Sequence, residues 1–185
     1  MRKKPNLGVR MERCTRVLIS DPEEWKGKWR ELMPEAKEVF LELGCGKGRF
    51  TAETAAQNPQ ALYIAVERVP DAMVIAMERV CAQELHNVFF VDGDVAQLPL
   101  FFAPGEVDRI YINFCDPWPS NRHAKRRLTH PDFLLRYRQV LAEAGRSTSR
   151  QTTGIYSSGP CSSSPGWALG CLGSPATCTP TASTV

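Results

Sequence analysis

"EVFLELGCGKGRF", residues 38–50, runs from an apolar stretch directly into a turn that contains three glycines. An apolar run of this length, bounded by glycine, predicts a buried strand over residues 38–44. Glycine allows positive φ and close approach of a ligand, and such a turn opens the N-terminus of the next helix. The spacing is not that of the G-x-G-x-x-G dinucleotide fingerprint, so the turn alone is compatible with a ligand site or with a plain strand–helix connection.

The sequence around this turn alternates between apolar runs and stretches with helical periodicity. Further strands are predicted over residues 61–68, 87–94 and 107–114, and helices over residues 23–33, 49–59, 69–85 and 130–145, the last with Gly145 as its C-cap. This alternation predicts an α/β fold, a Rossmann-like, doubly wound and mostly parallel sheet. Such a sheet binds its ligands at the carboxyl ends of the strands.

A carboxylate lies at or just beyond the end of each predicted strand. Glu42 lies inside the end of the first strand, Glu67 ends the second, and Asp94 ends the third. Asp116 follows the fourth strand. Each acid alone is equally compatible with an ordinary polar strand end, but four acids at one edge of a sheet repel one another unless a ligand shares them.

The acids and the glycine turn together predict a site for a nucleoside that carries positive charge. Carboxylates accept hydrogen bonds from ribose hydroxyls and from an adenine amino group. The sequence has no Walker lysine–Ser/Thr pair for a nucleotide's phosphates. S-adenosylmethionine brings adenine, ribose, a sulfonium and an amino group without phosphate, and we expect it to be the cofactor. Its predicted contacts are Glu42, Gly44, Gly46, Glu67, Asp94 and Asp116.

The stretch "NFCDPWPSNRHAKRRL", residues 113–128, follows Asp116 with a stiff turn and a basic run. The net charge of +3 is small, so affinity for nucleic acid would have to come from a local patch such as this one. The basic run is either an RNA-contacting surface or a solvated face, and Trp118 either stacks on a base or packs against the sheet. The predicted RNA contacts are Arg122, His123, Lys125, Arg126 and Arg127.

Composition sets the broad class of the protein. The chain has 185 residues, of which 43% are hydrophobic, enough for one soluble domain with a sizeable core. It begins without the apolar run of a signal peptide and contains no membrane-length apolar stretch, so we expect a cytoplasmic protein. The sequence leaves the oligomeric state open, and we take a monomer as the expectation. The cysteines and histidines lack zinc spacing, which predicts no metal site. Cys45, Cys81 and Cys115 are expected to be reduced and buried.

The last 40 residues differ from the rest of the chain. They contain two arginines and no other charged residue, and 16 of them are Ser or Thr. We therefore divide the chain into a domain over residues 1–145 and a low-complexity tail over residues 146–185, which is either disordered or the product of a shifted reading frame. With suitable codons and one base lost near Gly145, "RSTSRQTT" conceals EIHFKTDN, an alternating, strand-like peptide.

Several segments resemble the bacterial tRNA (guanine-N7)-methyltransferase family, a class of Rossmann-like methyltransferases. They are "KGKW" (26–29), "LELGCGKGRF" (41–50), "ALYIAVE" (61–67), "DGDV" (92–95), "YINFCDPWP" (111–119) and "RHAKRRLTHPDFL" (122–134). The resemblance covers residues 1–145. It implies methyl transfer from S-adenosylmethionine to N7 of a guanine at position 46, in the tRNA variable loop.

The resemblance also assigns roles to residues. Glu42, Glu67, Asp94 and Asp116 match the methyl-donor contacts, Asp116 matches the catalytic residue, and residues 122–127 match the RNA-contacting segment.

The chain departs from the family's pattern at two places. Ser120 stands where the family usually has a substrate-contacting lysine, and Thr152 stands where it has a substrate-binding aspartate. Two alternatives therefore remain open. The chain could be a methyltransferase of the same fold with another substrate, or a truncated and catalytically impaired fragment.

Overall fold

The computed structural model describes residues 6–113 and 121–150. Within these residues, six strands form one sheet in the order β1-β4-β3-β2-β5-β6, and all neighbouring pairs are parallel. The strands are β1 (Leu18–Ile19), β2 (Glu38–Leu43), β3 (Ala61–Glu67), β4 (Val88–Asp92), β5 (Val107–Asn113) and β6 (Leu141–Arg150). The predicted α/β class and parallel sheet are confirmed.

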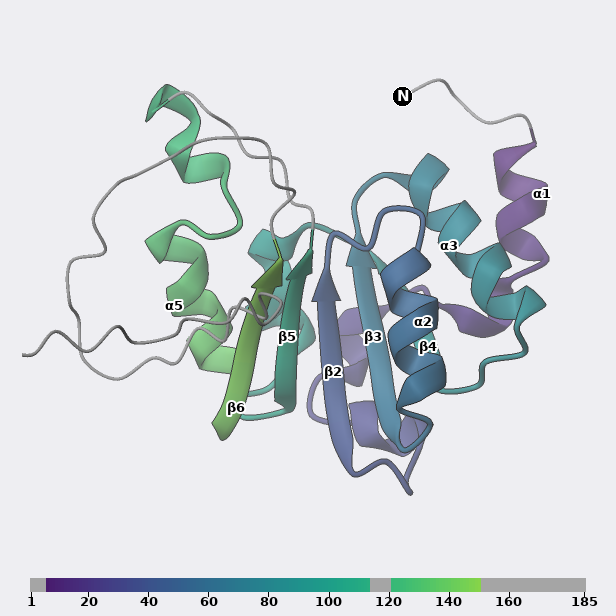
Figure 1. Cartoon of the computed structure of the whole chain (residues 1–185), viewed down its shortest axis with the longest axis horizontal. Helices are drawn as coiled ribbons and strands as arrows, with labels where there is room; N and C mark the ends of the chain where they lie inside the picture. The colour runs from purple at the N-terminus through teal and green to yellow at the C-terminus, as the bar shows by residue number, and fades with distance from the viewer. Residues whose placement is uncertain (1–5, 114–120, 151–185) are drawn as a thin grey trace, which may run out of the picture.

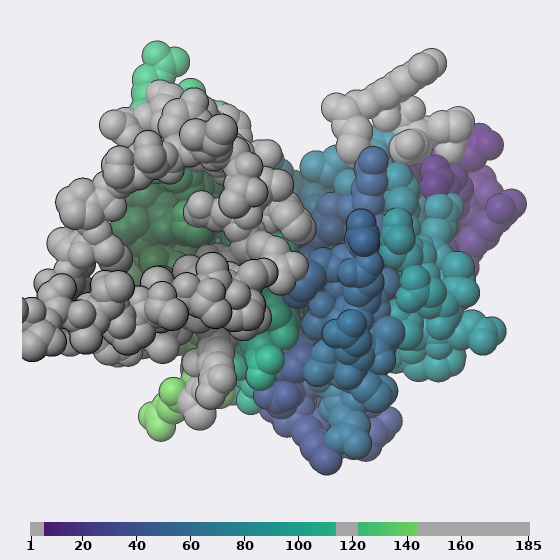
Figure 2. All heavy atoms as spheres, in the orientation of Figure 1, coloured from purple at the N-terminus to yellow at the C-terminus, as the bar shows by residue number. Residues whose placement is uncertain are grey.

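Helices cover both faces of the sheet. α1 (Leu7–Glu12), α2 (Arg49–Gln57) and α3 (Pro70–Ala82) lie on one face, and η3 (Trp29–Leu32), α4 (Leu98–Phe101) and α5 (Pro131–Val140) lie on the other. Apolar side chains alternate between the two cores because successive strand residues point to opposite faces. Phe40, for example, packs with α2 and α3, whereas Leu41 packs with α4 and α5. In Figure 2, α2 and α3 form one continuous surface.

The strand order reverses between β2 and β5. β2 pairs with β3 on one side and with β5 on the other, so the crossovers from these two strands leave in opposite directions. In Figure 1 the labelled arrowheads of β2, β3, β5 and β6 lie at the same edge, which we call the carboxyl rim. A reversal of this kind opens a crevice outside the strand ends, the usual ligand position in an open α/β sheet.

The predicted helix over residues 130–145 is wrong in its last third. α5 ends at Val140, and Leu141 is already extended, with φ −73° and ψ 138°. β6 then runs from Leu141 to Arg150 beside β5. Backbone pairing with β5 outweighs the helix propensity of the alanines and glutamate in "LAEAG", because propensity is a weak preference that tertiary pairing overrides. The strand also crosses the expected boundary between residues 145 and 146.

The predicted helix over residues 23–33 is also wrong. Two short 3₁₀ helices, η2 (Pro22–Trp25) and η3, take its place, separated by Gly27 at φ +81°. The Glu106 carboxylate accepts hydrogen bonds from the backbone N–H groups of Gly27, at 3.0 Å, and of Trp29, at 3.1 Å. These bonds hold the chain in a turn that a continuous helix would not allow.

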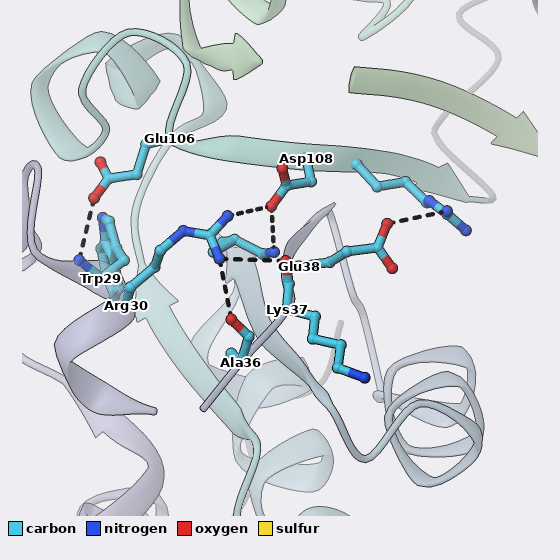
Figure 3. A network of polar contacts seen from close by, with 9 residues as sticks. Trp29, Arg30, Ala36, Lys37, Glu38, Glu106 and Asp108 are labelled. Atoms are coloured by element: carbon cyan, nitrogen blue, oxygen red, sulfur yellow. Dashed lines mark hydrogen bonds and ion pairs between the residues drawn. The ribbon is translucent and has the colours of Figure 1, made fainter. Parts of the chain in front are cut away.

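A polar network anchors this turn at the amino ends of β2 and β5 (Figure 3). Arg30 donates to the Asp108 carboxylate at 2.6 Å and to the carbonyl oxygen of Ala36 at 3.2 Å. Asp108 also accepts from the backbone N–H of Val39 at 2.7 Å. The neighbouring "KGKW" segment therefore lies at the edge of the sheet opposite the carboxyl rim, where it ties the N-terminal region to the sheet.

Candidate functional site

Glu42 is a buried carboxylate at the carboxyl rim, with 1% of its surface exposed. Its Oε2 accepts hydrogen bonds from the hydroxyls of Thr51, at 2.6 Å, and Tyr63, at 3.1 Å, and its Oε1 accepts from Asn113 Nδ2 at 3.4 Å. Burial raises the pKa of the Glu42 carboxyl group, while these three donors oppose the rise because they stabilise the charged form.

A cavity of about 460 Å³ opens beside Glu42, between the ends of β2 and β5 and the start of α2. It is lined by Glu42, Gly44, Cys45, Gly46, Lys47, Arg49, Phe50, Glu53 and Asn113. Its volume is within the range of small-molecule sites, and its position is the crevice that the strand order predicts. Glu42, Gly44 and Gly46 are therefore brought together, as the sequence analysis predicted, whereas Glu67 and Asp94 lie outside the lining.

The glycine turn shapes one wall of this cavity. Gly44 adopts φ +75°, and a Cβ built on it would meet no atom within 4 Å, so the backbone there faces open space. Gly48 adopts φ +67°, but its Cβ would lie 2.4 Å from Ala76 Cβ. Gly44 thus leaves room for a ligand, and Gly48 allows α2 to pack closely against α3. This cradle and the acid beside it fit an adenosyl amino acid.

Glu67 ends β3, as predicted, and binds the backbone of the glycine turn. Its Oε2 accepts from the N–H of Gly46 at 2.8 Å, and its Oε1 accepts from the N–H groups of Arg68 and Val69, each at 2.9 Å. The carboxylate therefore fixes the turn against the end of the neighbouring strand. A carboxylate oxygen that accepts one N–H can accept a further hydroxyl, because each oxygen has two lone pairs.

Asp94 does not end the third strand, which corrects the expected placement. β4 ends at Asp92, whose register partner is Glu67. Asp94 instead caps the short helix η4 (Val95–Gln97), where its Oδ1 accepts from the N–H of Ala96 at 2.8 Å, and it pairs with Arg68 at 3.4 Å. Asp92 is exposed, but partial desolvation of its carboxyl group and the nearby Glu67 raise the pKa of that group.

Cys45 is buried, as expected, and it also lines the cavity. Burial, followed by the charges of Glu42 and Glu67, raises the pKa of its thiol well above the ordinary value, so the thiol stays protonated at neutral pH. Cys81 is half-buried and free, and Cys115 lies outside the described residues.

The basic run forms η5 (Asn121–Arg126), on the same side as the strand arrowheads and above α5 in Figure 1. Arg122, Lys125 and Arg126 are exposed, and His123 and Arg127 are half-buried. No acidic residue lies between residues 117 and 131 of the sequence, and we refer to these five basic side chains as the cationic surface of η5. The predicted catalytic residue, Asp116, lies outside the described residues, as does Ser120.

Three residues of the site had no role in the sequence analysis: Thr51, Tyr63 and Asn113. Each carries a hydrogen-bond donor at a position that is otherwise apolar and buried. Buried polar side chains need hydrogen-bond partners. Polar residues at positions that the pattern predicts to be buried are therefore the sequence signal for a buried partner such as Glu42.

Two kinds of feature are absent from the residues that the structure describes. Among residues 6–113 and 121–150, no group of three or more His, Cys, Asp or Glu side chains is arranged to hold a metal ion. None of the helices in that range is long and apolar enough to cross a membrane.

Comparisons with known proteins agree with this fold. A family model described as "Putative methyltransferase" matches residues 36–150. The solved "antibiotic-resistance methyltransferase Kmr" superposes with a TM-score of 0.55 at 20% identity, covering 72% of this chain and 68% of that chain. An "antibiotic related Methyltransferase" superposes with a TM-score of 0.51 at 21% identity, covering 63% of this chain and 59% of that chain. At these identities the two structures show the fold alone.

The sequence relationship is more specific. The protein named tRNA (guanine-N(7)-)-methyltransferase from Bacillus cytotoxicus is 41% identical over 145 residues, which cover 78% of this chain and 67% of that protein. Together with the family match over residues 36–150, this identity confirms the resemblance carried by the motifs: the chain belongs to the bacterial tRNA (guanine-N7)-methyltransferase family of enzymes.

Proposed function

We propose that this chain transfers a methyl group from S-adenosylmethionine to N7 of a guanine in the variable loop of tRNA, at position 46 of the tRNA numbering. The observation that carries the proposal is the cavity at the reversal of the strand order, which has a buried carboxylate, Glu42, in its wall. The 41% identity to a protein named for the same reaction supports the choice of substrate.

The donor's amino acid end fits the wall formed by Glu42 and the glycine turn. Among the described residues, Glu42 Oε2 accepts two hydroxyl hydrogen bonds, whereas Oε1 accepts one long bond from Asn113. Oε1 is therefore the atom with capacity left for the donor's ammonium group. Gly44 and Gly46 let the ligand approach the backbone closely. On this proposal Glu67 and Asp94 accept hydrogen bonds from the ribose and adenine.

The reaction requires little acid–base catalysis by the protein. Guanine N7 carries a free lone pair at neutral pH, and the bound donor supplies an electrophilic methyl group on sulfur. The chain's task is to hold N7 in line with that methyl group. The methylated base is cationic, so a carboxylate beside it stabilises the charge as it develops. We assign this role to Asp116, which the sequence places beside Pro117 and close to Pro119, residues whose rings fix φ.

The tRNA would be held by the cationic surface of η5. Arg122, Lys125 and Arg126 are exposed there, and they follow Asp116 closely in the sequence. Arginine and lysine side chains neutralise phosphates and position a nucleic acid without reading its sequence. We propose that Arg122, His123, Lys125, Arg126 and Arg127 form this contact.

The test is direct formation of N7-methylguanosine. The chain is incubated with a tRNA transcript and methyl-labelled donor, and the digested RNA is analysed by mass spectrometry. We expect Asp116→Ala to abolish the product without unfolding the protein, and Asp132→Ala, which removes an exposed acid of α5, to leave it unchanged. Undiminished turnover by Asp116→Ala would refute the catalytic assignment.

We further propose that the reading frame shifts near Gly145, so that residues 146–185 are not the family's C-terminal region. The composition of this region motivates the proposal, since 16 of its 40 residues are Ser or Thr. The coding DNA decides it: if no one-base change restores an EIHFKTDN-like strand, the proposal is wrong. An inactive 185-residue chain beside an active frame-restored protein would identify this chain as a catalytically impaired fragment.

A further inference from the structure

Asn113 has an unusual place at the carboxyl rim. It is the last residue of β5, it is buried with 5% of its surface exposed, and it lies three residues before Asp116 in the sequence. Glu42 and Tyr111 are register partners, so Asn113 lies on the same face of the sheet as Glu42. Its amide crosses from β5 to β2, the two strands that flank the reversal of the strand order, and it also lines the cavity.

The two oxygens of Glu42 differ in their surroundings. Oε2 accepts hydrogen bonds from the hydroxyls of Thr51 on α2, at 2.6 Å, and of Tyr63 on β3, at 3.1 Å. Oε1 receives a single hydrogen bond among the described residues, from Asn113 Nδ2 at 3.4 Å. Among the described residues, the oxygen that is left for a ligand is thus oriented by one side chain. That side chain comes from β5, the strand that directly precedes residues 114–120 in the sequence.

We propose that Asn113 is a positioning residue for methyl-donor binding: its amide orients Glu42 Oε1 toward the cavity so that this oxygen can pair with the donor's ammonium group. Asn113 acts through Glu42 and not through the reacting atoms. The inference rests on the proposed function, because it takes an adenosyl amino acid as the ligand of the cavity.

Several other ionisable groups lie near Glu42. Glu67 and Cys45 lie close by, and Lys47, Arg49 and Glu53 line the same cavity. Arg49 is paired with Glu53 at 2.8 Å, and the pKa of Tyr63 is raised by its burial and by Glu42 itself, so the phenol stays neutral. None of these groups contacts Oε1 among the described hydrogen bonds.

The consequence is a defined dependence on pH. Burial already raises the pKa of Glu42, and the Asn113 donor lowers it by stabilising the charged form. Removing that donor therefore raises the pKa further. Because an ammonium group binds the ionised carboxylate, the variant should lose donor affinity as the pH falls and recover it as the pH rises above the new pKa.

The experiment measures donor affinity by calorimetry with the full chain at several pH values. A hydrogen bond to a charged group contributes about 1.5–3 kcal/mol, and the length of this one favours the lower limit. We expect Asn113→Ala to weaken S-adenosylmethionine binding roughly 10-fold near pH 6, and less at pH 8.5. Asn113→Asp keeps the shape of the side chain but places a second carboxylate against Oε1, so it should weaken binding more.

A matched ligand and a double-variant cycle separate positioning from general damage. Methylthioadenosine lacks the amino acid end, so Asn113→Ala should leave its affinity unchanged. In a Glu42→Gln background the same substitution should have no further effect on S-adenosylmethionine, whereas Lys47→Ala, in the same cavity wall, should add independently. Equal losses for both ligands, or additivity of Asn113→Ala with Glu42→Gln, would overturn the proposal.

A readout without ligand completes the test. Titration of the ¹³C-labelled Glu42 carboxyl group by NMR should show a higher pKa in Asn113→Ala than in the parent chain, and an unchanged titration would again overturn the proposal. Failure of the parent chain to bind S-adenosylmethionine at all would count against the proposed function together with this inference. Normal donor binding and methylation by Asn113→Ala would refute the role of Asn113 but leave the proposed function standing.

Discussion

Gly44 and Gly48 belong to the same turn, yet their replacement by alanine should have opposite consequences. Both residues have left-handed backbone conformations, φ +75° and φ +67°, which cost a non-glycine residue about 1–2 kcal/mol. At Gly44 that is the whole stability cost, because a Cβ would point into open space. At Gly48 the new Cβ would lie 2.4 Å from Ala76 Cβ and 2.8 Å from Ala76 Cα.

Relief of that contact requires α2 and α3 to separate by about 1 Å, which is an overpacking cost of about 1–3 kcal/mol. We therefore expect Gly48→Ala to lower the free energy of unfolding by about 2–5 kcal/mol in total, against about 1–2 kcal/mol for Gly44→Ala. With a urea slope of about 1–3 kcal/mol/M, the unfolding midpoints of the two variants should differ by about 1 M.

The assay pairs urea unfolding with donor calorimetry. Gly44→Ala should lose donor affinity while keeping most of its stability, and Gly48→Ala should show the reverse. The double variant Gly48→Ala, Ala76→Gly should recover part of the stability, because the Ala76 Cα remains close. Equal unfolding midpoints for the two single variants would refute the assignment of one glycine to the ligand and the other to helix packing.

Three further predictions follow from other contacts. Glu106→Gln should destabilise the fold by about 1.5–3 kcal/mol in urea unfolding, because Glu106 accepts three backbone N–H bonds as a charged group. Asp92→Asn should raise the melting temperature at pH 7 but not at pH 3, because the raised pKa of Asp92 makes its ionised form unfavourable above the ordinary value of 3.8. Arg126→Ala with Arg127→Ala should reduce the slope of log affinity for tRNA against log salt by about 1 to 2 if both contact phosphates. The matched control removes two exposed lysines at the opposite edge of the sheet, Lys28 and Lys37.

The central strands and the helices between them could be predicted because their signals are local. Apolar runs such as residues 61–67 end at glycine, proline or charge, and Pro70 and Asp71 mark the start of α3 by well-known preferences. The position of Glu42 and Glu67 at one rim followed from the parallel order of their strands. Asp94 was misplaced by two residues because "VDGD" offers two acids and the sequence does not show which one turns away to cap a helix.

The parts that could not be predicted depend on distant partners. The 3₁₀ turns around Gly27 are held by Glu106, 79 residues away. The short α1 carries no buried residue of its own, and its Arg10 is held to Glu78 of α3 by two 2.6 Å bonds. α5 stops at Val140 because β5 offers a free edge to the next residues. In each case a tertiary contact decides a local structure whose own propensity is weak.

β6 has a consequence for how the protein behaves at high concentration. Among the strands of residues 6–113 and 121–150, it is the last in the sheet, so one side of its ten-residue backbone has no neighbouring strand. Open strand edges of this length recruit strands from other molecules. Light scattering at increasing concentration should therefore reveal self-association, and a proline placed on the outward side of β6 should suppress it. Self-association of the chain thus becomes a physical measure of whether the outer edge of β6 is open.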